Sequence, residues 1–149
     1  MTTEIQAKTK FYYDDVQVGD AIPALVKPPV TLNQLVRYSG ASGDFNPLHT
    51  DPEMGKRMGT GGIIAHGMFV MGCVGQFMSD YAGPGGLRKF GVRFKSMTHL
   101  GEVLTCSGTI LEKYEAEGEG RVAGEVKVAD EKGDVKVVGS FVAALPRRG

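Results

Sequence analysis

One short stretch of the chain carries the side chains best suited to acid–base chemistry. Asp44 and His49 lie five residues apart in the run GDFNPLH at positions 43–49. A straight helix would not bring them together, because residues on one helix face lie three or four apart. Asn46 followed by Pro47 predicts a turn, which can point both side chains at one position. A carboxylate and an imidazole that converge there could hold a water molecule and act as general base and general acid.

The motif lies in the connection between two predicted helices. Thr31 and Gln34 have capping-box spacing at the start of a short helix that runs to about Ser39. Residues 41–62 follow as an ordered loop with at most a turn of helix, and a connection this long is usually functional. A second helix over residues 66–81 is apolar on most sides, which predicts burial. Its glycines each weaken it by about 1 kcal/mol relative to Ala, so we expect another group to approach it closely.

After the second helix the apolar pattern changes to the period of a strand. Residues 90–95 alternate, and longer strands are predicted over residues 103–111, 122–128 and 135–145, with turns at 117–120 and 130–133. A short strand is predicted at residues 12–18, before the first helix. We therefore expect an α+β fold: a curved antiparallel β-sheet wrapped around a long buried central helix. Residues 1–149 are expected to form one domain, with a loose N-terminal arm over residues 1–10.

The composition excludes several functional classes. Seventeen Lys and Arg balance seventeen Asp and Glu, so no strong field draws the chain to nucleic acid or an anionic membrane. The polar N-terminus argues against a signal peptide, and no apolar run is long enough to cross a bilayer. Cys73 and Cys106 stand far apart and match no metal spacing, which favours reduced thiols in a cytoplasmic protein.

Two motifs in order resemble the MaoC-like, (R)-specific enoyl-CoA hydratase family. The first is GDFNPLH at residues 43–49, and the second is IAHGM at residues 64–68, which opens the second helix. The resemblance covers roughly residues 13–144 and includes the run VRF at 92–94. His-Gly-Met alone would be a weak signal. The first motif fixes several unlike residues at set spacing, so the pair in this order is specific.

The resemblance implies a hot-dog fold and a homodimer, or a higher homo-oligomer, with a substrate tunnel near the subunit interface. It implies that Asp44 and His49 are the catalytic pair and that the backbone N–H of Gly67 is the oxyanion donor. The implied reaction is the reversible hydration of trans-2-enoyl thioesters to (R)-3-hydroxyacyl thioesters, carried by coenzyme A or acyl carrier protein, without a metal or redox cofactor. A donor at a helix N-terminus suits the negative charge that develops on the thioester oxygen.

Other residues are candidates for substrate contacts, each with a plainer interpretation. Ser42 and Asn46 flank the pair and could support it. His66 could touch substrate, although a structural role at the helix start is the simpler reading. Met68 could line an acyl tunnel or belong to the core. Arg93 shares a strand face with two lysines and could meet carrier phosphates, or that face could be merely solvated.

The sequence leaves open two alternative functions and an alternative role for the candidate residues as metal ligands. Hot-dog folds also host thioester hydrolases, because fold does not determine function. A non-catalytic acyl-binding subunit of a dehydratase heterodimer is a second alternative, which an intact Asp44 and His49 disfavour. A metal site built from Asp44, His49 and His66 is a third, but these residues lack the close helical spacing of zinc motifs.

Overall fold

The computed structural model describes residues 9–149. The loose arm expected over residues 1–10 therefore falls almost wholly outside the described residues. In chain order the elements are β1 (Ala21–Val26), α1 (Leu32–Ser42), the 3₁₀-helix η1 (Pro47–His49), α2 (Pro52–Met58), α3 (Gly67–Ala82), β2 (Leu87–Phe94), β3 (Thr105–Ala116), β4 (Glu119–Ala129) and β5 (Val135–Leu145).

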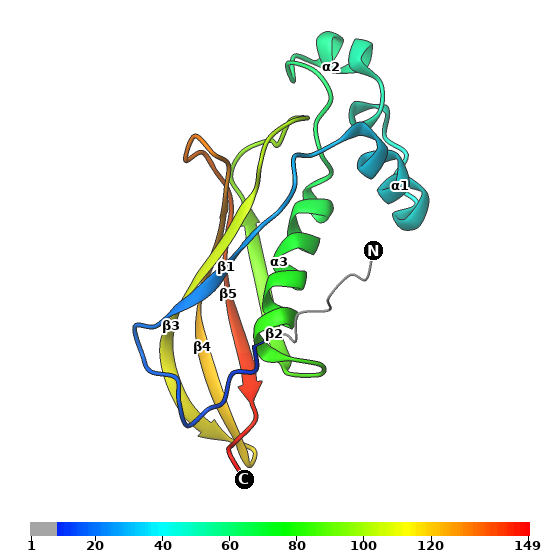
Figure 1. Ribbon diagram of the computed structural model, residues 1–149. Helices are drawn as coiled ribbons and strands as arrows, with labels where there is room; N and C mark the ends of the chain where they lie inside the picture. The colour runs from blue at the N-terminus through cyan, green and yellow to red at the C-terminus, as the bar shows by residue number, and fades with distance from the viewer. Residues whose placement is uncertain (1–8) are drawn as a thin grey trace, which may run out of the picture.

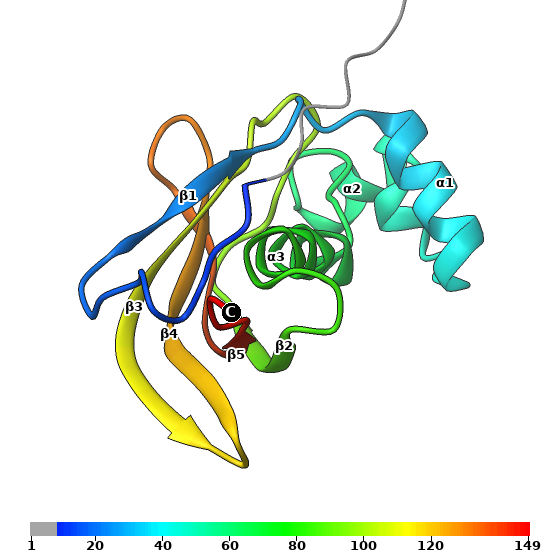
Figure 2. The same ribbon diagram turned by 60° about the horizontal axis from the view of Figure 1, so that its bottom comes forward.

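The strands form one antiparallel sheet in the order β1-β3-β4-β5-β2. Each of the four ladders contains a register shift, which bends a strand and increases its twist. As a result the sheet curves around α3, which lies along its concave face (Figures 1 and 2). This arrangement confirms the predicted α+β architecture.

The core lies between α3 and the concave face of the sheet. Val74, Phe77 and Met78 on the helix are at most 2% exposed, as are Ile110 and Phe141 on the strands. Burying each of these side chains contributes about 1.5–3 kcal/mol of transfer free energy. The prediction of a buried central helix is therefore confirmed, and packing holds α3 at a defined position on the sheet.

The prediction of a strand at residues 12–18 is wrong. This segment forms turns, and β1 begins later, at Ala21. Two local hydrogen bonds explain the difference: Asp15 N–H donates to the Tyr12 carbonyl, and Gln17 N–H donates to the Asp20 carboxylate. The first is a backbone turn, and in the second the Asp20 carboxylate takes a backbone N–H that strand pairing would need.

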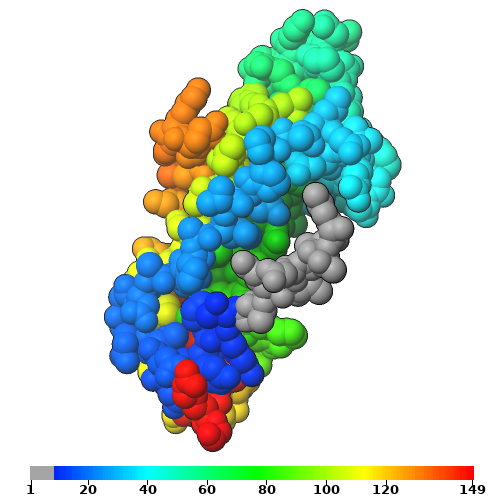
Figure 3. Space-filling view, in the orientation of Figure 1, coloured from blue at the N-terminus to red at the C-terminus, as the bar shows by residue number. Residues whose placement is uncertain are grey.

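The segment between β1 and α3 forms a lobe at one end of the molecule (Figures 1 and 3). The capping box predicted at Thr31 and Gln34 is present at the start of α1. α2 is a seven-residue helix in a region predicted as loop with at most one turn of helix. Asp51 caps it by accepting a hydrogen bond from Glu53 N–H, which is a strong helix-start interaction.

Within residues 9–149, no helix is both long enough and apolar enough to cross a membrane. Both cysteines are buried and free. Burial raises the pKa of the Cys106 thiol to about 12, and it raises the pKa of Cys73 as well. Protonated thiols are poor nucleophiles, so neither cysteine is placed for covalent chemistry.

Candidate functional site

The turn that carries Asp44 is held by short side-chain-to-backbone hydrogen bonds. α1 ends at Gly43, which adopts a left-handed conformation with φ of 78° that glycine tolerates best. Asp44 N–H then donates to Ser42 Oγ at 3.2 Å, and Asn46 N–H donates to Asp44 Oδ1 at 3.2 Å. Asn46 Oδ1 in turn accepts from Leu48 N–H at 3.1 Å. Ser42 and Asn46 therefore shape the turn, and the second carboxylate oxygen of Asp44 takes no part in it.

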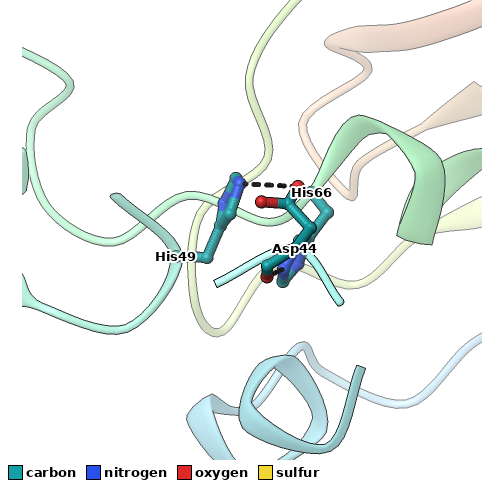
Figure 4. A group of neighbouring side chains, drawn as sticks. All are labelled: Asp44, His49 and His66. Carbon is teal, nitrogen blue, oxygen red and sulfur yellow. Dashed lines mark hydrogen bonds and ion pairs between the residues drawn. The ribbon is translucent and has the colours of Figure 1, made fainter. Parts of the chain in front are cut away.

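His49 is buried and its ring is oriented by a backbone carbonyl. His49 Nδ1 lies 2.8 Å from the Ile64 carbonyl oxygen, so Nδ1 carries the hydrogen and donates a hydrogen bond to that oxygen. In the neutral ring, Nε2 is then an unprotonated acceptor. It lies 3.7 Å from Asp44 Oδ2, too far for a direct hydrogen bond (Figure 4). Two acceptors thus face each other, one on a buried ring and one on a carboxylate whose side chain is 52% exposed.

His66, the N-cap residue of α3, contacts both Asp44 and His49. Its Nε2 lies 3.2 Å from the Asp44 carbonyl oxygen and 3.1 Å from Ser39 Oγ, so Nε2–H is the donor (Figure 4). Its Nδ1 is buried without a partner in the described residues. The ring stacks on His49 with centroids 3.8 Å apart, and Tyr38 contacts it edge-on. Desolvation by burial lowers the pKa of His66 below its usual value, so this ring is neutral at physiological pH.

The lowered pKa of His66 predicts a loss of stability in mild acid. The unfolded chain binds a proton at about pH 6.5, whereas the folded chain resists it, so acid favours the unfolded state. The melting temperature of the wild type should therefore fall as pH drops below about 6.5, and more steeply than that of His66→Phe, which cannot titrate. Thermal unfolding at several pH values, followed by circular dichroism, measures both slopes. Equal slopes for the two proteins would contradict a lowered pKa of His66 in the folded protein.

A cavity of about 560 Å³ opens beside His49 at the start of α3. It is lined by residues of four segments: His49, Ile64, Ala65, Gly67, Val70, Phe94, Lys95, Ser96, Met97, Thr98, Lys136 and Val137. The first N–H groups of a helix have no intrahelical acceptor, and no side chain caps α3 at its N-cap residue, His66. The N–H of Gly67 therefore lies at the cavity without a local partner, at the positive end of the helix dipole.

The structure separates the other predicted substrate contacts from this cavity. Ser42 and Asn46 hold the turn, and His66 is 1% exposed and packs behind His49. Met68 is 57% exposed, and Arg93 lies exposed on β2. None of these five side chains lines the cavity.

Sequence reasoning missed Lys136, which lies in the cavity wall. The only local signal was a lysine at the start of a strand, next to the acidic turn 130–134.

The three polar side chains do not suit a shared metal ion. Asp44, His49 and His66 can place ligand atoms within 4.8 Å of one another. However, the two imidazoles are stacked at an interplanar angle of 24°, so their in-plane lone pairs run side by side instead of converging. One nitrogen of each ring also donates to a backbone carbonyl.

A larger hollow, of about 940 Å³, lies at the opposite end of α3, near the loop 83–86 and the residues after β5. Arg88 in its wall pairs with Glu119, and Arg147 pairs with Glu115. It contains neither a histidine nor a cysteine. The candidate site is therefore the cavity beside His49.

The family model for the MaoC like domain matches residues 15–132 of the chain. The chain belongs to the MaoC-like domain family. The R-hydratase PhaJ1 of Pseudomonas aeruginosa has a similar structure, with a TM-score of 0.84 and 24% identity over 93% of this chain and 88% of that one. The ChsH1–ChsH2 complex of Mycobacterium tuberculosis gives a TM-score of 0.76 and 21% identity over 87% of this chain and 98% of the matched one. These likenesses confirm the predicted hot-dog fold.

A relative with a named activity indicates a class of reaction. The 3-hydroxybutyryl-CoA dehydratase of Methylorubrum extorquens is 23% identical over 139 residues, which are 92% of this chain and 85% of that protein. This MaoC-like protein is thus related to dehydratases and hydratases, and hydration or its reverse is the general activity supported.

Proposed function

We propose that this MaoC-like protein reversibly hydrates trans-2-enoyl thioesters to (R)-3-hydroxyacyl thioesters, with Asp44 and His49 activating the water. One observation carries the proposal. The free Nε2 of His49 faces Asp44 Oδ2 at 3.7 Å, beside a cavity into which the N-terminus of α3 opens. A separation of this size admits one water molecule that donates a hydrogen bond to each acceptor.

In the proposed reaction the bridging water loses a proton to the pair and its oxygen bonds to C3 of the enoyl group. The C2–C3 double-bond electrons move toward the thioester carbonyl, whose oxygen becomes negative. The same proton, held by the pair, is then delivered to C2. The reverse sequence expels water and gives dehydration. His49 is well placed for the first step because its Nδ1–H bond to Ile64 orients the ring and leaves Nε2 as the acceptor of the neutral imidazole, aimed at the water.

The developing negative charge needs a donor, and Gly67 N–H is the proposed one. It lies at the start of a sixteen-residue helix whose dipole favours an anion at this end. The Gly67 residue lets the thioester approach the backbone, because a side chain there would occupy the same space. A β-carbon at position 67 would already lie 3.1 Å from the Phe94 ring.

Gly67→Ala is expected to lower kcat/KM for enoyl thioesters by about tenfold to a hundredfold, since misplacement by about 1 Å can cost that much. Stability should not fall, because the exposed edge of the Phe94 ring can shift and Ala favours helix over Gly. Steady-state kinetics and thermal unfolding check the two parts separately. The double variant Gly67→Ala/Phe94→Leu tests whether the added methyl group lowers activity by blocking the substrate or by displacing the Phe94 ring. Full recovery of activity would assign the loss to contact with Phe94 instead of blocked approach to the N–H.

The proposal includes an acyl-CoA or acyl-carrier-protein thioester as substrate, a homodimer or higher homo-oligomer, and a cytoplasmic location. It needs no metal or redox cofactor. Arg93 lies outside the cavity lining of the single chain, and we propose that it contacts the phosphates of the carrier. Met68 is proposed to line the acyl tunnel. The ChsH1–ChsH2 relative is a complex of two named proteins, which keeps a heterodimer as the alternative assembly.

The test is absorbance of the enoyl-thioester band with crotonyl-CoA and longer trans-2-enoyl-CoAs. Loss of the band without release of free thiol supports hydration, and chiral analysis of the product tests the (R) assignment. Release of thiol would instead favour a thioester hydrolase. Tight binding without turnover would favour a non-catalytic subunit.

A further inference from the structure

A buried ammonium group lies in the wall of the cavity and has no role in the proposed chemistry. Lys136, on β5, is 2% exposed. Its Nζ lies 2.8 Å from Asp134 Oδ2, 3.1 Å from Glu102 Oε2 and 3.5 Å from Asp130 Oδ2, and it donates to the Met97 carbonyl at 2.9 Å. Burial alone would lower the pKa of Lys136, but the carboxylates outweigh it and raise the pKa. The ammonium is therefore charged and fully occupied by protein oxygens.

These partners come from two separate parts of the chain: Met97 and Glu102 lie in the connection between β2 and β3, and Asp130 and Asp134 lie in the hairpin between β4 and β5. Isolated buried charges are costly, and in some proteins a buried ion pair is retained because it defines a geometry. Because four oxygens already surround Nζ, Lys136 is unsuited to bind a substrate anion. The contacts of Lys136 indicate instead that it holds the turn at residues 97–99 in place.

Backbone groups of that turn are bonded to the ion cluster and to the segment that precedes α3. The Met97 carbonyl accepts from Lys136 Nζ, and His99 N–H donates to Glu102 Oε2 at 3.0 Å. Between them, the Thr98 carbonyl accepts from Ala65 N–H at 2.8 Å. Lys136 therefore holds the turn at Met97, and Glu102 holds it at His99. The hydrogen bond between Thr98 and Ala65 fixes the position of Ala65 relative to this turn.

Ala65 stands between the two groups that the proposed reaction needs. On one side, Ile64 forms an antiparallel β-bridge with His99, and the Ile64 carbonyl accepts a hydrogen bond from the Nδ1–H of His49. On the other side, the chain continues through His66 to Gly67, whose N–H opens to the cavity. One backbone segment therefore sets both the direction of His49 Nε2 and the place of the oxyanion donor.

We propose that Lys136 is a positioning residue, which holds the turn 97–99 so that the segment 64–67 presents the Ile64 carbonyl to His49 and the Gly67 N–H to the substrate. The kinetic part of this inference rests on the proposed function. A spectroscopic part does not: the Nδ1–H of His49 is hydrogen-bonded whether or not the protein hydrates enoyl thioesters.

The experiment compares Lys136→Met, Lys136→Arg and Glu102→Gln with wild type. Methionine removes the charge with little change in length, arginine restores the charge, and glutamine keeps an acceptor for His99 N–H. Arg121→Met is the matched control, because Arg121 is also a mostly buried cation paired with two glutamates, near the start of β4. Kinetics are measured below the melting temperature of every variant, and the His49 Nδ1–H proton is followed by ¹⁵N-edited NMR.

We expect Lys136→Met to lower kcat by about tenfold to a hundredfold, the range for small displacements of reacting groups. The His49 Nδ1–H signal should shift or broaden in the same variant. Lys136→Arg should recover most of kcat, Glu102→Gln should show a smaller loss, and Arg121→Met should leave both readouts unchanged.

Wild-type kcat with an unchanged His49 signal in folded Lys136→Met would overturn the inference, and so would lost kcat with an unchanged signal. If Lys136→Met does not fold, Glu102→Gln decides by the same two readouts. If the wild type itself lacks hydratase activity, the proposed function fails, while the NMR signal still decides the inference.

Discussion

Replacing Asp44 with Asn is expected to lower kcat/KM for crotonyl-CoA by about a hundredfold to ten-thousandfold, the usual contribution of a general acid or base. The fold should be unaffected. Asn keeps a side-chain oxygen that can accept from Asn46 N–H, so the turn persists. What disappears is the negative charge of the oxygen that faces His49 Nε2. Steady-state kinetics with wild type and variant, together with thermal unfolding, measure the two effects.

Asp51→Asn is the matched control for that measurement. It makes the same chemical change in the same lobe, at the cap of α2 instead of beside His49 Nε2. Asn caps helices about as well as Asp, so activity and stability should both stay near the wild-type values. Near-normal turnover by folded Asp44→Asn would remove Asp44 from the mechanism.

Replacing His49 with Gln is expected to lower kcat/KM by a similar factor, about a hundredfold to ten-thousandfold. Glutamine is also polar and its amide can donate to the Ile64 carbonyl, but it has no nitrogen that can take a proton near neutral pH. The loss should appear in kcat more than in KM, because the imidazole acts on water and not on the acyl chain. Initial rates over a range of substrate concentrations separate these parameters.

The double variant Asp44→Asn/His49→Gln tests whether the two residues act as a unit. Groups that share one catalytic step are strongly non-additive, so the double variant should be only slightly less active than either single variant. Losses that multiply would indicate two independent roles and would contradict a single water held between them.

Local physical rules determined much of the secondary structure. The capping box of Thr31 and Gln34 acts over three residues, and it begins α1 as predicted. The second predicted helix is apolar on most sides, a property of its own residues, and α3 is buried as expected. The prediction of a strand at residues 12–18 failed because Asp15 N–H donates to the Tyr12 carbonyl and the Asp20 carboxylate accepts from Gln17 N–H, which favours turns. Alternation of residue types does not reveal this competition.

The sequence by itself determined the motif, its turn chemistry and the candidate catalytic pair. Those depend on residues within about five positions of each other, where Asx-type hydrogen bonds and helix caps operate. Only the tertiary structure decided which nitrogen of His49 is free, because its partner, Ile64, lies fifteen residues away across the start of α3. It alone placed Lys136 at Met97, thirty-nine residues distant, since that contact requires β5 to lie beside β2. Contacts of this range are set by sheet pairing and packing around a common core, which no local pattern specifies.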